Sequence, residues 1–264
     1  MKILISNDDG INAYGLKVLS ETLAANHDVY VVAPDRERSG SGHSLTVHTP
    51  LRVKELEATN GVKRRWQTSG TPSDCVKLAL CAILDESEKP DLVISGINHG
   101  PNLASDILYS GTVSCAVEAS MLGIPSIAVS LASLSFNQNS FDFAADFIAQ
   151  FIEKLDSYSF EPKTFLNINI PPIPQQDIPG LAITKLGDKT FSNTYEKRLD
   201  PHGKAYYWLA GELVTHTHND GTDLAAIRDN KISITPLCYD MTKQSLTQQL
   251  STLLSNEPLL TSIK

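Results

Sequence analysis

The chain has 264 residues, of which 41% are apolar and 20% are charged, and its formal net charge at pH 7 is −8. This acidic balance excludes sequence-independent binding to DNA or RNA, because such binding needs basic groups that release phosphate counterions. The sequence contains no apolar run long enough to span a bilayer and no pattern of a secretory signal. We therefore expect a globular cytoplasmic protein built as one α/β domain with an appendage.

Apolar runs typical of buried strands alternate with helical patterns over the first 155 residues. The predicted strands are Lys2–Ser6, Val29–Ala33, Asp91–Ser95 and Ser126–Ser130. The predicted helices are Tyr14–Ala25, Ser73–Leu84, Val113–Leu122 and Phe141–Leu155. This alternation predicts right-handed βαβ units, and therefore a doubly wound, mainly parallel α/β sheet with helices on both faces.

A hairpin and a further strand extend this arrangement. Leu51–Leu56 and Arg64–Thr68 flank the dipeptide Asn60-Gly61, which is a strong signal for a β-hairpin inserted into the α/β core. Phe165–Ile170 is predicted to form another strand. The proline-rich stretch Pro171–Pro179 then ends the regular alternation and indicates a change in architecture.

The C-terminal part of the chain has a different character. Thr190–Gly221 has no convincing periodicity, yet it contains the aromatic residues Phe191, Tyr195, Tyr206, Tyr207 and Trp208. So much aromatic surface is unusual for a solvated loop, so this segment packs either on its own core or on a second subunit. A late strand over Lys231–Pro236 and a final helix over Met241–Leu254 follow. We expect a core of residues 1–187 and, over 188–264, an extended oligomerisation arm with the late strand and helix.

Two adjacent carboxylates follow the first predicted strand directly, in the order Asn7-Asp8-Asp9-Gly10. Ligands of open α/β sheets bind just beyond the carboxyl ends of the strands, so acids at this point are placed for chemistry. Gly10 permits the turn that lets both side chains face one point. The alternative interpretation is a plain turn in which an aspartate caps the next helix.

Three further polar turns are predicted to gather at the same edge of the sheet. They lie at residues 36–43, 95–102 and 110–112. Together with the first turn they offer carboxylate, hydroxyl and amide oxygens, which are the ligands that Mg²⁺ or Mn²⁺ takes. Zinc is a poorer match because the chain has no clustered Cys or His, and its four cysteines lack CxxC spacing. The sequence thus predicts a site for a hard divalent cation.

An anion site is predicted beside the cation site. Ser110-Gly111-Thr112 precedes an apolar helical pattern, so the free N–H groups of a helix start would face the crevice. Simple N-capping by the Ser or Thr is the alternative. Gly40 suits either backbone contact with phosphate or loop flexibility. His43 is a candidate phosphate contact or proton donor, although it could be merely exposed.

Three common enzyme motifs are absent from the sequence. No GxGxxG follows the first strand, and no GxxxxGK[ST] occurs, so neither a dinucleotide fingerprint nor a Walker A loop is present. No GxSxG elbow of a serine hydrolase occurs.

Five motifs, in order and spacing, resemble the stationary-phase survival family SurE. They are Asn7-Asp8-Asp9-Gly10; Ala33-Pro34-Asp35 with Ser39-Gly40 and His43; Ser69-Gly70-Thr71-Pro72 with Asp74-Cys75-Val76; Ser95-Gly96-Ile97-Asn98 with Gly100-Pro101-Asn102; and Tyr109-Ser110-Gly111-Thr112-Val113 with Ala116 and Glu118. The resemblance runs from Met1 to about Pro236 and weakens over the arm and the final helix.

The resemblance implies a metal-dependent phosphatase that acts on nucleoside 5′- and 3′-monophosphates. It further implies a Rossmann-like core and a homodimer or homotetramer whose subunits exchange C-terminal elements. By motif position, the ligands of one divalent metal ion are Asp8, Asp9, Ser39 and Asn98, and the two acids are also the catalytic residues. The residues expected to contact the substrate phosphate are Asn7, Gly40, His43, Ser110, Gly111 and Thr112.

Two questions stay open at this point. The attacking group is either a metal-bound water or one of the two aspartates, and adjacent acids favour the water. The second question is whether the protein turns its ligand over, because a non-catalytic nucleotide-binding sensor could keep the same crevice. The acids favour an enzyme, since a pure phosphate binder gains nothing from two carboxylates that face an anion unless a cation lies between them.

Overall fold

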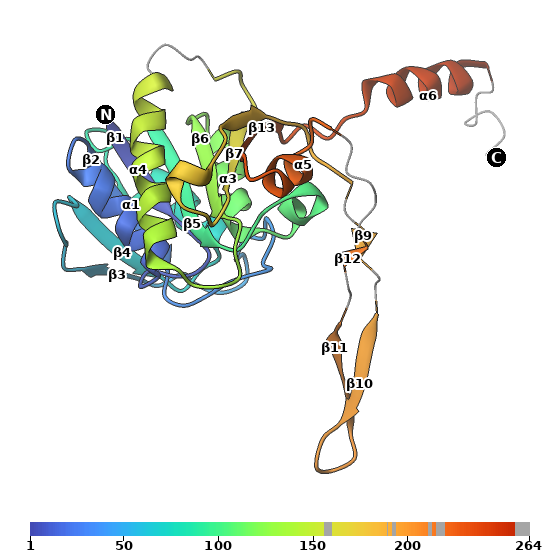
Figure 1. The fold of residues 1–264 in the computed structure, drawn as a ribbon, viewed down its shortest axis with the longest axis horizontal. Helices are drawn as coiled ribbons and strands as arrows, with labels where there is room; N and C mark the ends of the chain where they lie inside the picture. Colours follow the sequence, from blue (N-terminus) through green and yellow to red (C-terminus); the bar gives the residue numbers. More distant parts are fainter. Residues whose placement is uncertain (156–159, 189, 192–193, 211–212, 215–219, 257–264) are drawn as a thin grey trace.

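The computed structural model of this protein describes residues 1–155, 160–188, 190–191, 194–210, 213–214 and 220–256. Within these ranges a mixed sheet forms the centre of the molecule (Figure 1). Its strands, in spatial order, are β3 (Val53–Leu56), β4 (Arg64–Thr68), β2 (Asp28–Pro34), β1 (Lys2–Ser6), β5 (Leu92–His99), β6 (Ser126–Leu131), β7 (Thr164–Ile170), β13 (Ile232–Cys238) and β8 (Leu181–Ile183).

The six central strands from β4 to β7 run parallel, as the alternating pattern predicts. The hairpin prediction is confirmed, because β3 pairs antiparallel with β4. At the other edge β13 pairs antiparallel with β7, and β8 pairs parallel with β13. Strand β13 thus brings residues from late in the chain into the main sheet.

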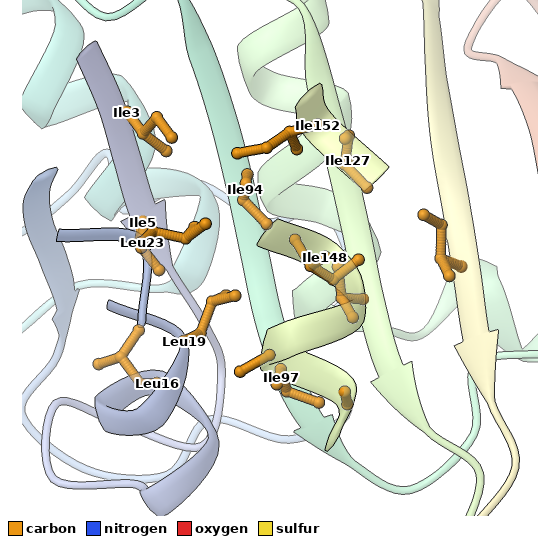
Figure 2. Close-up of a cluster of buried hydrophobic side chains, with 14 of the residues drawn as sticks. Ile3, Ile5, Leu16, Leu19, Leu23, Ile94, Ile97, Ile127, Ile148 and Ile152 are labelled. Carbon is orange, nitrogen blue, oxygen red and sulfur yellow. The ribbon is translucent and has the colours of Figure 1, made fainter. Parts of the chain in front are cut away.

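Helices cover both faces of the sheet, which confirms the doubly wound arrangement (Figure 1). On one face lie α1 (Tyr14–Ala24) and α4 (Gln138–Lys154). On the other lie α2 (Pro72–Leu78) and α3 (Gly111–Met121). Side chains alternate along β1 accordingly. Ile3 and Ile5 pack in the cluster of Figure 2 with α1 and α4, whereas Leu4 packs with α2 and α3.

The region between β4 and β5 differs in part from the predicted helix over Ser73–Leu84. Helix α2 ends at Leu78, and a π-helical turn over Ala79–Ile83 completes the segment. The helix starts with a capping box, in which Thr71 accepts a bond from Asp74 N–H and Asp74 accepts one from Thr71 N–H. A π-helical turn keeps much of the apolar spacing of an α-helix, so the sequence pattern does not distinguish them.

Among the described residues, two 3₁₀ turns and two further helices lie outside the sheet and the four helices that cover it. The 3₁₀ turns are η2 (Ala104–Leu108) and η4 (Gln175–Asp177). The late part of the chain contributes a six-residue helix, α5 (Asp223–Arg228), and a final helix, α6 (Gln244–Asn256). Among the described residues no helix is long and apolar enough to cross a membrane.

The aromatic segment after β8 forms two antiparallel strand pairs, which sequence periodicity did not predict. One pair joins β10 (Tyr195–Leu199) to β11 (Ala205–Leu209), and the other joins β9 (Thr190–Phe191) to β12 (Leu213–Val214). Every residue of β10 and β11 is exposed. Because neither face of this hairpin is buried in the chain, it lacks the alternation that reveals a half-buried strand. Figure 1 shows the hairpin and α6 extending away from the sheet.

Candidate metal and phosphate site

The two adjacent acids follow the carboxyl end of β1 and lie beside the carboxyl end of β5. These strands are neighbours in the sheet, with Ser6 opposite Ser95. Beyond this register position the backbone N–H of His99 donates to Oδ2 of Asp9 over 3.1 Å. The 7–10 turn and the end of β5 are therefore in direct contact, as the sequence predicts for turns at one sheet edge.

Asn7 holds the turn that presents the acids. Its side-chain oxygen accepts from the N–H of Gly10, and its side-chain nitrogen donates to the carbonyl of Gly10. Asn7 is fully buried, and Gly10 has a φ of +99°, which L side chains rarely adopt. Both ends of the Asn7 amide thus act within the turn and orient Asp8 and Asp9, whereas its contact with phosphate stays a prediction.

Asp8 lies against the first turn of helix α3. Its side chain is 4% exposed, and the hydroxyl of Thr112 donates to its Oδ1. The contact leaves no room for a side chain at Gly111, because a Cβ there would lie 2.7 Å from the Cβ of Asp8. Burial raises the pKa of the Asp8 carboxyl, while hydrogen bonds from Thr112 and the backbone of Gly111 oppose that rise.

Asp9 is less buried, and its neighbour affects its ionisation. Its pKa is raised from 3.8 to about 6, first by burial and then by the negative charge of Asp8. The bond from His99 N–H lowers the pKa but does not compensate. Two carboxylates are therefore held together although each makes the other harder to ionise.

The arrangement fits a hard divalent cation. No lysine, arginine or histidine in the part of the chain that the structure describes forms an ion pair with Asp8 or Asp9. A cation between the two carboxylates would remove their repulsion and favour their ionised forms. The described residues contain no group of three or more His, Cys, Asp and Glu suited to a metal. Neutral oxygens must then complete the ligand set.

The two predicted neutral ligands lie on different elements: Asn98 lies near the end of strand β5, where a polar turn was predicted, and Ser39 lies in the loop after β2. The Nδ2 group of Asn98 donates to the carbonyl of Gly100 over 2.8 Å. The side-chain oxygen of Asn98 therefore points away from that carbonyl. Ser39 is exposed and follows Arg38, whose N–H donates to the carbonyl of Asp8 over 2.7 Å. The hydroxyl of Ser39 donates to Glu37 in this structure. The backbone thus brings Ser39 beside Asp8, and a rotation of its side chain would free the hydroxyl for a cation.

Three of the predicted phosphate residues, Ser110, Gly111 and Thr112, form the start of α3. Ser110 is the N-cap, with its hydroxyl accepting from Val113 N–H over 3.0 Å, so the capping interpretation is confirmed. Gly42 N–H donates to the carbonyl of Tyr109 and thereby holds the loop of Gly40 next to this helix start. Nothing lies within 4 Å of a Cβ built on Gly40, so its backbone faces open space.

His43 contacts a residue to which sequence reasoning gave no role. Its Nε2 lies 2.8 Å from Oε2 of Glu118, whose side chain is 1% exposed. Lys77 donates to the other oxygen of the same carboxylate over 2.7 Å. The signal in the sequence is an acid within the apolar helical pattern Val113–Leu122, where a charge needs a partner.

Comparison with known proteins identifies close relatives. A family model described as Survival protein SurE matches residues 3–193. A protein named 5′-nucleotidase SurE from Thermosynechococcus vestitus is 50% identical over 96% of this chain and 97% of its own length. A relative of the same name from Moorella thermoacetica is 50% identical over 97% of this chain and 96% of its own. The crystal structure of the SurE protein from Aquifex aeolicus matches with a TM-score of 0.81 and 39% identity, over 95% of this chain and 98% of that chain.

The raised pKa of Asp9 predicts how the stability of the metal-free chain depends on pH. Between pH 3.8 and 6 the folded chain binds a proton at Asp9 more tightly than the unfolded chain does. Ionisation of Asp9 therefore lowers the free energy of unfolding as the pH rises through that window. The decrease is complete above pH 6. Asp9→Asn should raise the free energy of unfolding at pH 7.5 by roughly 1–3 kcal/mol and change it little at pH 4.

Urea unfolding in the presence of a chelator measures this effect. Asp146→Asn, which alters an exposed carboxyl of α4, serves as the control and should change little at either pH. An Asp9→Asn gain that is equal at pH 4 and pH 7.5 would contradict the electrostatic explanation.

Proposed function

The chain belongs to the SurE family, and on that premise we propose that it is a metal-dependent phosphomonoesterase that hydrolyses nucleoside 5′- and 3′-monophosphates to nucleoside and phosphate. The observation that carries the proposal is the contact of Asp8, the first acid of the pair, with the first turn of α3. This contact supports the proposal of a cation site at the acids with an anion site beside it at the helix start. Relatives that match over nearly their whole length are named 5′-nucleotidase.

We propose that Asp8, Asp9, Ser39 and Asn98 hold one divalent ion, Mg²⁺ or Mn²⁺. When bound, such an ion polarises phosphoryl oxygens and lowers the pKa of a coordinated water. The hydrolysis forms a bond between the water oxygen and phosphorus and breaks the ester bond, and the leaving ribose oxygen takes up a proton. Asp8 and Asp9 are the proposed catalytic residues because they are the acids that face the position of the cation.

The chain's own donors have a second task in this proposal. Phosphate carries negative charge and so needs positive groups opposite the acids. The start of α3, with Ser110, Gly111 and Thr112, has the positive end of the helix dipole at this position. Asn7, Gly40 and His43 are proposed to complete the phosphate contacts. The Thr112 hydroxyl already bonds to Asp8, so its part is to hold the acid and the helix start in register.

The late part of the chain supports a proposal about assembly. Tyr207 and Trp208 of β11 are 58% and 60% exposed, and α6 exposes Leu250 and Leu253 at 56% and 58%. Aromatic and aliphatic surface of this extent is stabilised when a partner covers it. We propose a core of residues 1–187 and a segment 188–264 that packs on this core, as β13 does in the main sheet, and on a partner subunit in a homodimer or homotetramer.

Phosphate release from a panel of 5′- and 3′-nucleoside monophosphates tests the proposed function. The wild-type protein should release phosphate with Mg²⁺ or Mn²⁺ and lose the activity in chelator. Asp8→Asn should lower the rate at least about a hundredfold, because it removes half of the charge facing the cation, and Asp146→Asn should not. Failure to release phosphate from every nucleotide, together with retained nucleotide binding, would instead favour the sensor.

A graded pair of variants tests the neutral ligands. Asn98→Ala should weaken metal binding roughly tenfold, since an amide oxygen carries less charge than a carboxylate. Ser39→Ala should weaken it less, because water can replace a hydroxyl ligand. Isothermal calorimetry with Mn²⁺ measures both affinities. Unchanged affinity in both variants would show that the two loops do not reach the ion.

Replacing the exposed aromatic pair tests the assembly. The wild type should sediment as a dimer or larger at micromolar concentration, and Tyr207→Ser with Trp208→Ser should shift it toward monomer. Leu134→Ser removes an 84% exposed apolar side chain outside the arm and serves as the control. A monomeric wild type, or a double variant that keeps the wild-type mass, would contradict this use of the arm.

A further inference from the structure

Glu118 is a buried carboxylate that connects three parts of the molecule. It lies on α3, and its side chain is 1% exposed. One oxygen bonds to His43 in the loop after β2, and the other accepts from Lys77 of α2. The bond with His43 is the first cause of its lowered pKa, so the carboxylate is ionised in the folded chain.

The loop that Glu118 holds has little apolar anchorage. We define the 36–46 loop as the segment between Arg36 and Thr46, in which each residue is exposed or half-buried. Polar bonds fix it instead. Near its start Arg38 N–H donates to the carbonyl of Asp8, in its middle Gly42 N–H donates to the carbonyl of Tyr109, and at its end Thr46 N–H and hydroxyl donate to the carboxylate of Asp74.

The bond between His43 and Glu118 differs from the other hydrogen bonds of the 36–46 loop in its surroundings. It is the loop's hydrogen bond to a carboxylate of α3, and that carboxylate is almost fully removed from water. A charge-assisted bond in such surroundings is stronger than a bond between neutral groups. Lys77 occupies the second oxygen of Glu118, so the bond to His43 uses the other oxygen.

The spacing along α3 links this bond to the candidate site. Glu118 follows Gly111 by seven residues, which is two turns, so both lie on the same face of the helix. Gly111 contacts Asp8, and Glu118 contacts His43. One rigid helix face therefore sets the acid turn and the 36–46 loop relative to each other.

We infer that Glu118 is a positioning residue: through His43 it fixes the 36–46 loop, and with it Ser39 and Gly40, against the Asp8-Asp9 turn. The consequence for turnover rests on the proposed function, whereas the consequence for the loop does not. Glu118 acts through His43 and touches no reacting atom. Without it, the loop would sample other positions, and the substrate and the ion would both bind more weakly.

Three variants separate this role from a general effect on stability. Glu118→Ala removes the attachment. Lys77→Met removes the other partner of the same carboxylate, which lies on α2 outside the loop, and is the matched control. Lys77→Met combined with Glu118→Gln leaves an amide oxygen that can accept from His43 when the amide group turns toward it. This double variant should therefore restore much of what Glu118→Ala loses.

Hydrogen exchange of the metal-free proteins is the primary measurement. Amides of the 36–46 loop, Gly42 above all, should exchange at least about tenfold faster in Glu118→Ala, with no change in the strands β1 and β5. Lys77→Met should stay within about twofold of wild type, and the double variant should lie near it. In phosphate release, Glu118→Ala should raise KM about tenfold and leave kcat less affected, whereas simple unfolding of a fraction of molecules would lower kcat alone.

Loop exchange in Glu118→Ala that equals wild type would overturn the inference, as would an equal effect of Lys77→Met. If Glu118→Ala does not fold, His43→Ala removes the loop end of the same bond, and its exchange decides the question by the same criterion. A wild type that releases no phosphate would refute the proposed function and leave the exchange result to decide on Glu118. An active wild type with an unchanged loop in the variant would refute the inference alone.

Discussion

The contact between Asp8 and the first turn of helix α3 is the constraint on which the candidate site depends. A carboxylate next to another carboxylate is unfavourable, and burial makes it more so. The helix start offsets part of this cost with the Thr112 hydroxyl and backbone N–H groups. The close approach requires the absence of a side chain at Gly111. The same geometry brings the positive end of the helix dipole beside the negatively charged turn of Asp8 and Asp9. A phosphate bound to a metal ion needs this combination of charges.

The hydrophobic packing of the sheet explains how that contact is kept rigid. Leu4 of β1 packs under α2 and α3, and its neighbours Ile3 and Ile5 pack under α1 on the opposite face. Strand β1 is thus packed on both faces just before the chain reaches the acids. The 36–46 loop lacks such packing and depends on hydrogen bonds to the acid turn and the two helices. The site therefore combines a rigid half from the sheet with a loop held by polar contacts.

Sequence reasoning succeeded where burial repeats along an element. Strand β1, which leads into Asp8, the hairpin around Asn60 and the start of α3 follow from apolar periodicity and turn chemistry. The strand predicted to end at Ser95 continues as β5 through Asn98 to His99, because the polar residues after Ser95 have the composition of a turn. The arm hairpin was missed because both of its faces are exposed and so no period-2 pattern exists. The partner of Glu118 was missed because periodicity along one helix contains no information about which loop folds over it. The two hydrogen bonds between the Asn7 side chain and the backbone of Gly10 were likewise not predicted, since a short Asn–Gly spacing suits many turns.

The arm lies in the chain between β8, an edge strand, and β13, which separates β8 from β7 in the sheet, and this order has a consequence for synthesis on the ribosome. Strand β7 is an inner strand of the finished sheet, yet its outer neighbour β13 lies more than sixty residues further along the chain. During translation the earlier strands can assemble first, and β7 then presents an open edge until the hairpin has been made and β13 has emerged. The segments before and after the hairpin meet at an isolated β-bridge between Lys185 and Thr222. The hairpin is therefore an insertion whose two ends join the core at one point. A premature stop within the hairpin would leave the edge of β7 unpaired, whereas shortening the hairpin internally would preserve the order of the sheet.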